Sequence, residues 1–188
     1  MSQQELLTAV AAALDRIGIK YMVTGSIASS LYGEPRLSHD IDILLHVPAE
    51  NAIRLAGAFP PPRFYLDPPE AIAEMVREES MFNLVDTASG DKVDFWILTS
   101  SPYDRERFRR RVRVDAFGAA VWVSSSEDVI LSKLSWSMKA GGSEKQFRDA
   151  LRVFEVQQGS LDVAYCERWA AALGVQELWD RLRAEAGP

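Results

Sequence analysis

Apolar positions along the chain change between helical and strand spacing several times. Apolar side chains recur every three or four positions over residues 3–17, which predicts a helix that Gly18 ends. A buried strand at 21–23 and a short helix at 27–32 follow. Residues 39–45 then alternate acidic and apolar side chains before a fully apolar end, which predicts a strand with one face in the core.

The remaining pattern divides the chain into a mixed part and a helical part. Helices are expected at 48–59 and 69–78, a hairpin of strands at 81–85 and 92–98, and a second strand pair at 112–116 and 119–123. From Ser125 onward only helices are expected, at 129–138, 144–157, 161–173 and 175–185. We therefore predict an α/β (α+β) fold with a mixed β-sheet core over residues 1–124, flanked by helices, and a helical C-terminal subdomain over 125–188.

Composition excludes several classes of function. One cysteine and two histidines are too few for a structural zinc site, so a metal would need carboxylate ligands. No apolar run is long enough for a membrane span, and the first residues do not resemble a signal peptide. We therefore expect a cytoplasmic protein that does not associate with a membrane. The net charge of −6 argues against indiscriminate nucleic-acid binding. The arginines of residues 105–113 either pair with Asp104 and Glu106 or contact a phosphate-bearing substrate.

Two aspartates define the first candidate site. Asp40 and Asp42 are two positions apart in a predicted strand, so their side chains point to the same side while Ile41 and Ile43 point into the core. Two like charges this close repel each other unless cations lie between them. Mg²⁺, a hard cation that takes oxygen ligands, is the natural occupant, so the pair predicts a metal site.

A phosphate-binding turn is predicted ahead of these aspartates. Gly25 and Ser26 stand at the end of one predicted strand and open a predicted helix. A glycine lets a phosphate approach the backbone, helix N-terminal amides attract its charge, and Ser26 adds a hydroxyl donor. Gly25-Ser26, thirteen residues and then Asp40-Ile41-Asp42-Ile43 resemble the signature of the nucleotidyltransferase superfamily, whose best known relative is the catalytic domain of DNA polymerase β.

Two-metal chemistry requires a third carboxylate. Asp40 and Asp42 would bridge two Mg²⁺ ions about 3.5 to 4 Å apart, one activating the attacking oxygen and one neutralising the departing pyrophosphate. Asp94 is the best candidate for the third ligand because a charge within an apolar strand is costly without a partner. The resemblance implies an acid on such a strand that helps to deprotonate the acceptor hydroxyl. The competing acids are Glu79, Asp86 and Asp91. The last two stand at strand ends, where turn chemistry explains them.

Further segments resemble one group within this superfamily. The strand Arg36-Leu37-Ser38-His39-Asp40-Ile41-Asp42 is similar to one in AbiEii-like, type IV toxin–antitoxin nucleotidyltransferases. So are residues 126–134 and 145–149, and the likeness covers roughly residues 20–155. Arg36 and Ser38 either orient the triphosphate or structure their loop.

In the helical part the resemblance implies roles for Lys133 and Asp149. Lys133 would contact the phosphates of the nucleotide, and Asp149 would support the site. Lys133 could instead be a surface lysine that snorkels, and Asp149 could pair with Lys145 or Arg152 along its helix. Gln146 stands where the group often has another acid.

The resemblance implies a Mg²⁺-dependent nucleotidyltransferase that binds ATP or another nucleoside triphosphate. It would transfer the nucleoside monophosphate to an acceptor hydroxyl of tRNA, a protein or a small molecule and release pyrophosphate. A toxin–antitoxin role would add an antitoxin partner. Two alternatives stay open. One is a catalytically silent nucleotide-binding or partner-binding module of a toxin–antitoxin pair, and the other is an antibiotic-modifying nucleotidyltransferase.

Overall fold

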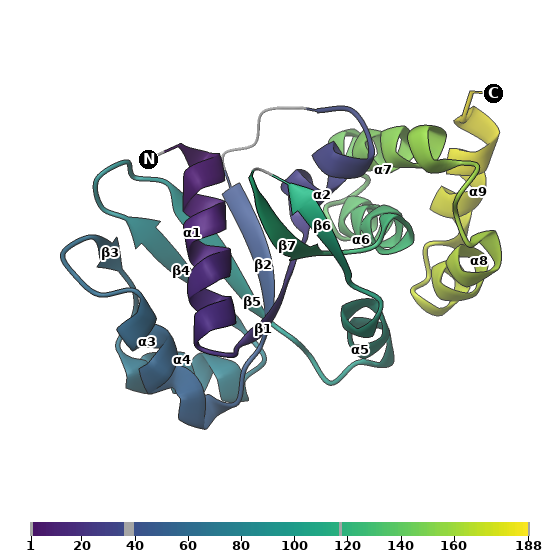
Figure 1. The fold of residues 1–188 in the computed structure, drawn as a ribbon. Coiled ribbons are helices and arrows are strands. Elements are labelled where there is room, and N and C mark those ends of the chain that lie inside the picture. Colours follow the sequence, from purple (N-terminus) through teal and green to yellow (C-terminus); the bar gives the residue numbers. More distant parts are fainter. Residues whose placement is uncertain (1, 36–39, 117, 188) are drawn as a thin grey trace. The chain divides into compact units, whose positions relative to one another are not determined.

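A computed structural model of the protein describes residues 2–35, 40–116 and 118–187 (Figure 1). It divides into two compact units. The first comprises Met1–Thr24 and Ser38–Val123, and the second comprises Gly25–Leu37 and Ser124–Pro188. Over the described ranges, every helix is too short or too polar to cross a lipid bilayer.

The first unit is built on a sheet of seven strands, counted over the described residues. In spatial order the strands are β3 (Phe64–Tyr65), β4 (Met81–Asp86), β5 (Lys92–Ile97), β2 (Asp40–His46), β1 (Lys20–Val23), β7 (Ala119–Val123) and β6 (Val112–Ala116). The pairs β2–β5 and β1–β7 are parallel and the other neighbours are antiparallel, so the sheet is mixed, as predicted.

One face of this sheet carries the main core. Ile41 and Ile43 on β2, and Val93 and Phe95 on β5, are completely buried because alternate side chains of a strand share a face. The helices of this unit include α1 (Gln3–Arg16), the short 3₁₀ helix η1 (Ala49–Asn51), α3 (Ala52–Ala58) and α4 (Pro69–Arg77). Figure 1 shows α1 running across the strands, with α3 and α4 next to each other. Phe59, just after α3, packs on Phe95 with ring centroids 6.1 Å apart, which places α3 on the core face.

The opposite face is polar at the start of β2 and apolar further along. Met22 and Leu44 form a small buried cluster there with Phe108 of α5 (Pro102–Arg109). Trp96 and Leu98 pack against this cluster and are partly buried. The face therefore presents its first residues, Asp40 and Asp42, outside the apolar packing.

The second unit is helical. It consists of α2 (Gly25–Tyr32), α6 (Ser126–Lys139), α7 (Glu144–Gln157), α8 (Val163–Ala172) and α9 (Gln176–Glu185). The short helix α2 packs against α6 and α7. Its next residue, Gly33, has no room for a side chain, because a Cβ there would lie 3.0 Å from the backbone nitrogen of Val153. Gly33 therefore lets the backbone at the end of α2 come close to the backbone of α7.

Some of the observed elements differ from the expected ones, and α6 begins three residues before the expected position 129. Residues 48–59 form η1 followed by α3 rather than one helix. The helix expected at 27–32 begins two residues earlier, at Gly25. Strand β3 has only two residues and pairs with β4, so it is too short to leave a periodic pattern in the sequence. Ser125 is the N-cap of α6, since its hydroxyl accepts a hydrogen bond from the Asp128 amide at 3.3 Å.

Candidate active site

Three aspartates lie on the polar face of two neighbouring strands. Asp42 of β2 stands directly opposite Asp94 of β5 in the parallel register, and Asp40 stands opposite Lys92. All four side chains share one face because their positions are two residues apart on each strand. The fold therefore brings together three residues that are up to 54 positions apart in the sequence.

The ammonium group of Lys92 lies between two of these carboxylates. Its Nζ is 3.1 and 3.2 Å from the two oxygens of Asp94 and 3.2 Å from Oδ1 of Asp40. The hydrogen bond to Asp94 raises the pKa of Lys92 above its ordinary value, so the lysine stays charged at neutral pH. Lys92 thus offsets part of the negative charge that the aspartates bring together.

Asp42 is oriented by a tryptophan. The indole Nε1 of Trp96 donates a hydrogen bond to Oδ1 of Asp42 at 3.1 Å. The Trp96 ring packs against the Met22, Leu44 and Phe108 cluster, which limits its movement. This contact therefore links the orientation of one carboxylate to the packing of the sheet face.

The donor set suits a hard divalent cation, but its arrangement also includes a lysine. Carboxylate oxygens are the protein ligands that Mg²⁺ prefers, and the aspartate face is partly open, with the Asp40 side chain 51% exposed and that of Asp94 12% exposed. Within the described ranges, no three His, Cys, Asp or Glu side chains are arranged to hold a metal ion. A metal bound by Asp40 and Asp94 would have to displace the Lys92 ammonium.

Gly25 and Ser26 begin helix α2 in the second unit. Gly25 has a φ of +64°, in the left-handed region where a side chain would strain the backbone. It directly follows Thr24, whose amide donates a hydrogen bond to the Asp42 carbonyl at 3.0 Å. The carbonyl of Ser26 accepts a hydrogen bond from the Ser29 hydroxyl at 3.0 Å. The sequence prediction of a strand that ends in a glycine turn and a helix is confirmed.

Lys133 of α6 and Asp149 of α7 form an ion pair, also in the second unit. Their Nζ and Oδ2 atoms are 2.8 Å apart, and the side chains are 5% and 10% exposed. Lys133 is therefore a buried residue rather than a snorkelling surface lysine. A phosphate contact by Lys133 stays a prediction.

The remaining candidates fall into two groups. Arg36 and Ser38 lie outside the described residues. Of the acids that compete with Asp94, Asp86 caps the hairpin turn by accepting from the amide of Ala88 at 2.9 Å, and Glu79 bonds to Ser100. Asp91 precedes β5 at the other side of that turn.

Sequence reasoning missed the contact between Trp96 and Asp42, and it allowed a neighbouring lysine only as a partner of Asp94 in a chain without a metal site; Lys92 is that lysine. Both belong to the strand that carries Asp94, two positions before and two after it, so strand alternation alone places them on the face of Asp94. Their partners on β2 depend on the register between two strands that are far apart in the sequence.

Comparison with known proteins identifies the fold. No protein-family model and no curated protein matches the chain. A crystal structure of an antigenic nucleotidyltransferase-like protein from Paracoccidioides brasiliensis matches with a TM-score of 0.59 and 16% identity, covering 98% of this chain and 94% of that one. The structure of ANT(2")-Ia in complex with adenylyl-2"-tobramycin matches with a TM-score of 0.57 and 16% identity, covering 94% and 99%. The chain therefore has the fold of nucleotidyltransferase-like proteins.

The position of Lys92 predicts a competition between this lysine and a metal. Replacing Lys92 with Met keeps the length of the side chain and removes the cation, so Mn²⁺ should bind about fivefold more tightly, the effect of losing a competing ion pair of up to about 1 kcal/mol. Calorimetric titration of the metal-free protein measures this. Lys20→Met, which removes an exposed lysine at the far end of β1, is the control and should leave Mn²⁺ affinity unchanged. Equal affinity in wild type and Lys92→Met would show that the lysine does not compete.

The buried pair predicts a stability effect in the second unit. Asp149→Ala leaves the ammonium of Lys133 buried without this partner and should lower the free energy of unfolding by about 3 to 5 kcal/mol. The double variant Lys133→Met, Asp149→Leu should recover most of that loss because it removes both charges. Urea unfolding measures both.

The exposed pair of Arg181 and Glu144 provides a control for this measurement. Glu144→Ala should change the urea midpoint far less than Asp149→Ala, because water already solvates both groups. Similar losses in the two variants would refute a special contribution from the buried pair.

Proposed function

We propose that this chain is a Mg²⁺-dependent nucleotidyltransferase that transfers a nucleoside monophosphate from a nucleoside triphosphate to an acceptor hydroxyl and releases pyrophosphate. The observation that carries the proposal is the placement of Asp40, Asp42 and Asp94 on one face of two adjacent strands. The fold that the chain shares with nucleotidyltransferase-like proteins supports the same proposal.

In this proposal the three aspartates hold two Mg²⁺ ions. When bound, these ions activate the attacking oxygen and neutralise the charge that develops on the leaving pyrophosphate. Asp40, Asp42 and Asp94 would supply the carboxylate ligands, and Trp96 keeps one oxygen of Asp42 in a fixed direction. Lys92 leaves its position between Asp40 and Asp94 before the site is complete.

Asp94 then acts on the acceptor. It faces Asp42 across the strand pair and helps to remove the proton of the acceptor hydroxyl. The acceptor oxygen forms a bond to the α-phosphorus while the bond from that phosphorus to the oxygen bridging to the β-phosphate breaks. The electron pair of that bond leaves with pyrophosphate, so no covalent intermediate with the protein is needed.

Gly25, Ser26 and Lys133 would bind the triphosphate. Gly25 has no side chain to block the approach of a phosphate to the backbone, and the Ser26 hydroxyl and the Lys133 ammonium are suitable donors to phosphate oxygens. Asp149 would hold Lys133 in place through their 2.8 Å ion pair. Arg36 and Ser38 complete the proposed set from the segment that precedes Asp40.

The acceptor is proposed from resemblance. The AbiEii-like resemblance favours tRNA or a protein as acceptor and a toxin–antitoxin role with an antitoxin partner. The adenylylated tobramycin bound to ANT(2")-Ia supports a small-molecule acceptor instead. ATP is the donor that this second comparison favours.

One observation favours a silent module as the second candidate. The ion pairs of Lys92 with Asp40 and Asp94 already compensate the carboxylates, so the cluster could be maintained without a metal. Such a module would bind a nucleotide or a partner protein and would transfer nothing.

Labelled transfer separates the two candidates. The protein is incubated with each α-labelled nucleoside triphosphate, Mg²⁺ and cell extract, and label is followed into RNA, protein and small molecules. Asp94→Asn should reduce transfer by about 10²- to 10⁴-fold, the range for loss of a group that assists proton transfer, while nucleotide binding persists.

Asp91→Asn is the matched control, since it changes the same group three residues earlier, beside the hairpin turn. It should transfer label at the wild-type rate. Nucleotide binding with no transfer in any extract would select the silent module. Transfer unaffected by Asp94→Asn would remove Asp94 from the site.

A further inference from the structure

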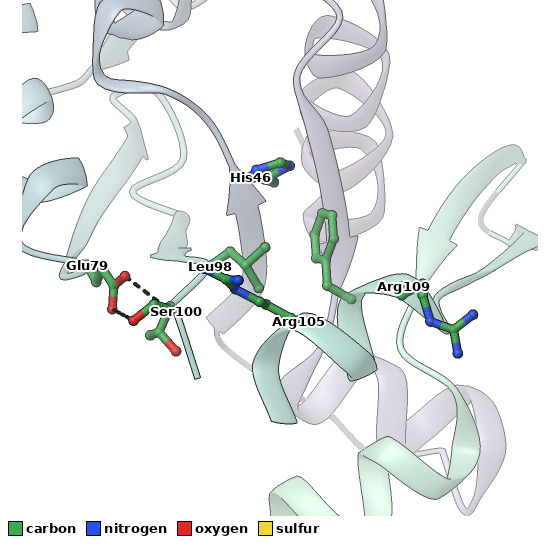
Figure 2. Close-up of a pocket in the computed structure, with 8 residues that line it drawn as sticks. His46, Glu79, Leu98, Ser100, Arg105 and Arg109 are labelled. Carbon is green, nitrogen blue, oxygen red and sulfur yellow. Dashed lines mark hydrogen bonds between the residues drawn. The ribbon is translucent and has the colours of Figure 1, made fainter. Parts of the chain in front are cut away.

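A separate pocket lies at the other end of the sheet face that carries the aspartates. It has a volume of about 390 Å³ and is formed by the end of β2, the residues that follow β5, Glu79 two residues after α4, and one side of α5 (Figure 2). His46 is four residues beyond Asp42 on β2, about 13 Å along the strand. All of these elements belong to the first unit, so the pocket is one local structure.

Arg105 of the pocket differs from the neighbouring arginines of α5 in its ion pairing. Arg107 forms an ion pair with Asp104 at 2.7 Å, and Arg109 pairs with Glu106 at 2.7 Å. No ion pair or side-chain hydrogen bond joins the guanidinium of Arg105 to any residue that the structure describes. In Figure 2 Arg105 reaches toward Leu98, whereas Arg109, which also lines the pocket, extends to the opposite side.

A further donor and an apolar wall surround Arg105. His46 is exposed and contacts Phe108 edge to face with ring centroids 5.9 Å apart, which leaves imidazole nitrogens at the mouth of the pocket. Ser100 forms another part of the wall, and its amide and hydroxyl both donate to Glu79 (Figure 2). Leu98 and Phe108 supply the apolar part. Arginine with a second donor is typical of phosphate recognition, because the guanidinium binds two oxygens at once.

Glu79 holds the Ser100 wall in position. It is the second residue after α4 and has a φ of +51°, a conformation that normally selects glycine at this place. Its carboxylate accepts from the Ser100 amide at 2.9 Å and from the Ser100 hydroxyl at 3.4 Å. Glu79 thus stands where a glycine would be less strained, and its two hydrogen bonds hold the loop that leads into α5.

We propose that this pocket binds the phosphate group of an organic phosphate, with Arg105 as its principal ligand and His46 as an additional donor. The apolar wall receives the part of the ligand that carries the phosphate, since the volume exceeds that of a phosphate alone. The phosphate comes from a small phosphate ester or from a nucleic-acid backbone. The site is independent of the proposed transfer reaction, because its residues are distinct from the three aspartates.

Binding measurements in EDTA, without nucleotide, test the site apart from catalysis. Inorganic phosphate, ribose 5-phosphate and a short single-stranded oligoribonucleotide are titrated into the full-length protein by calorimetry at low salt. Arg105→Gln should weaken binding by about tenfold or more, since it removes a charge-assisted contact. Arg109→Gln, one helical turn away, removes a guanidinium that also lines the pocket but already pairs with Glu106, so it should change binding by less than about twofold.

Glu79→Gln provides a test in the opposite direction. Glutamine keeps an oxygen for the Ser100 amide and removes a negative charge from the pocket wall, so phosphate should bind roughly two- to fivefold more tightly. Circular dichroism checks that each variant is folded.

The outcomes separate the ligand sources and the failure of the proposal. Tightest binding of ribose 5-phosphate identifies a small ester as the ligand, and tightest binding of the oligoribonucleotide identifies a nucleic-acid backbone. Absence of saturable binding of all three probes overturns the site. Equal losses in Arg105→Gln and Arg109→Gln also overturn it, since general charge attraction would then account for binding.

Discussion

Repulsion among Asp40, Asp42 and Asp94 is the constraint on which this structure depends. Asp42 and Asp94 stand directly opposite each other. Asp40 is two residues before Asp42 on β2, so its side chain lies on the same face. Such an arrangement persists only with compensating positive charge. Lys92 supplies it through contacts of 3.1 to 3.2 Å to Asp94 and Asp40. The same contacts determine what a metal must displace, so the chemistry of the site and the stability of the sheet are coupled at this lysine.

The buried side of the sheet determines where the charges lie. Ile41 and Ile43 are completely buried, so a shift of β2 by one residue would expose them and push the aspartates into the core. The parallel pairing with β5 then sets Asp42 against Asp94. Trp96 links the apolar cluster to the aspartate site, because its ring packs on that cluster while its indole nitrogen donates a hydrogen bond to Asp42. Hydrophobic packing on both faces thus positions a polar site that contributes little packing of its own.

Local patterns in the sequence were sufficient to predict most elements and the two aspartates of β2. Alternation around Ile41 and Ile43 identified the strand and its exposed side, and an acid within an apolar strand pointed to Asp94. The contacts of Lys92 and the Lys133–Asp149 pair depend on the pairing of distant segments, which no local pattern records. The pocket at Arg105 likewise joins three regions far apart in the sequence. The AbiEii-like resemblance stays a prediction, since the shared fold is common to nucleotidyltransferase-like proteins of other kinds.

Anomalous diffraction from crystals grown with Mn²⁺ and a non-hydrolysable nucleoside triphosphate tests most directly whether the three aspartates hold metal ions. We expect Mn²⁺ within about 2.0 to 2.3 Å of oxygens of Asp40 and Asp42, with Asp94 also ligating and the Lys92 ammonium moved away from both of its present partners. Anomalous density absent from this face, with Lys92 still bonded to Asp40 and Asp94 at saturating Mn²⁺, would contradict it.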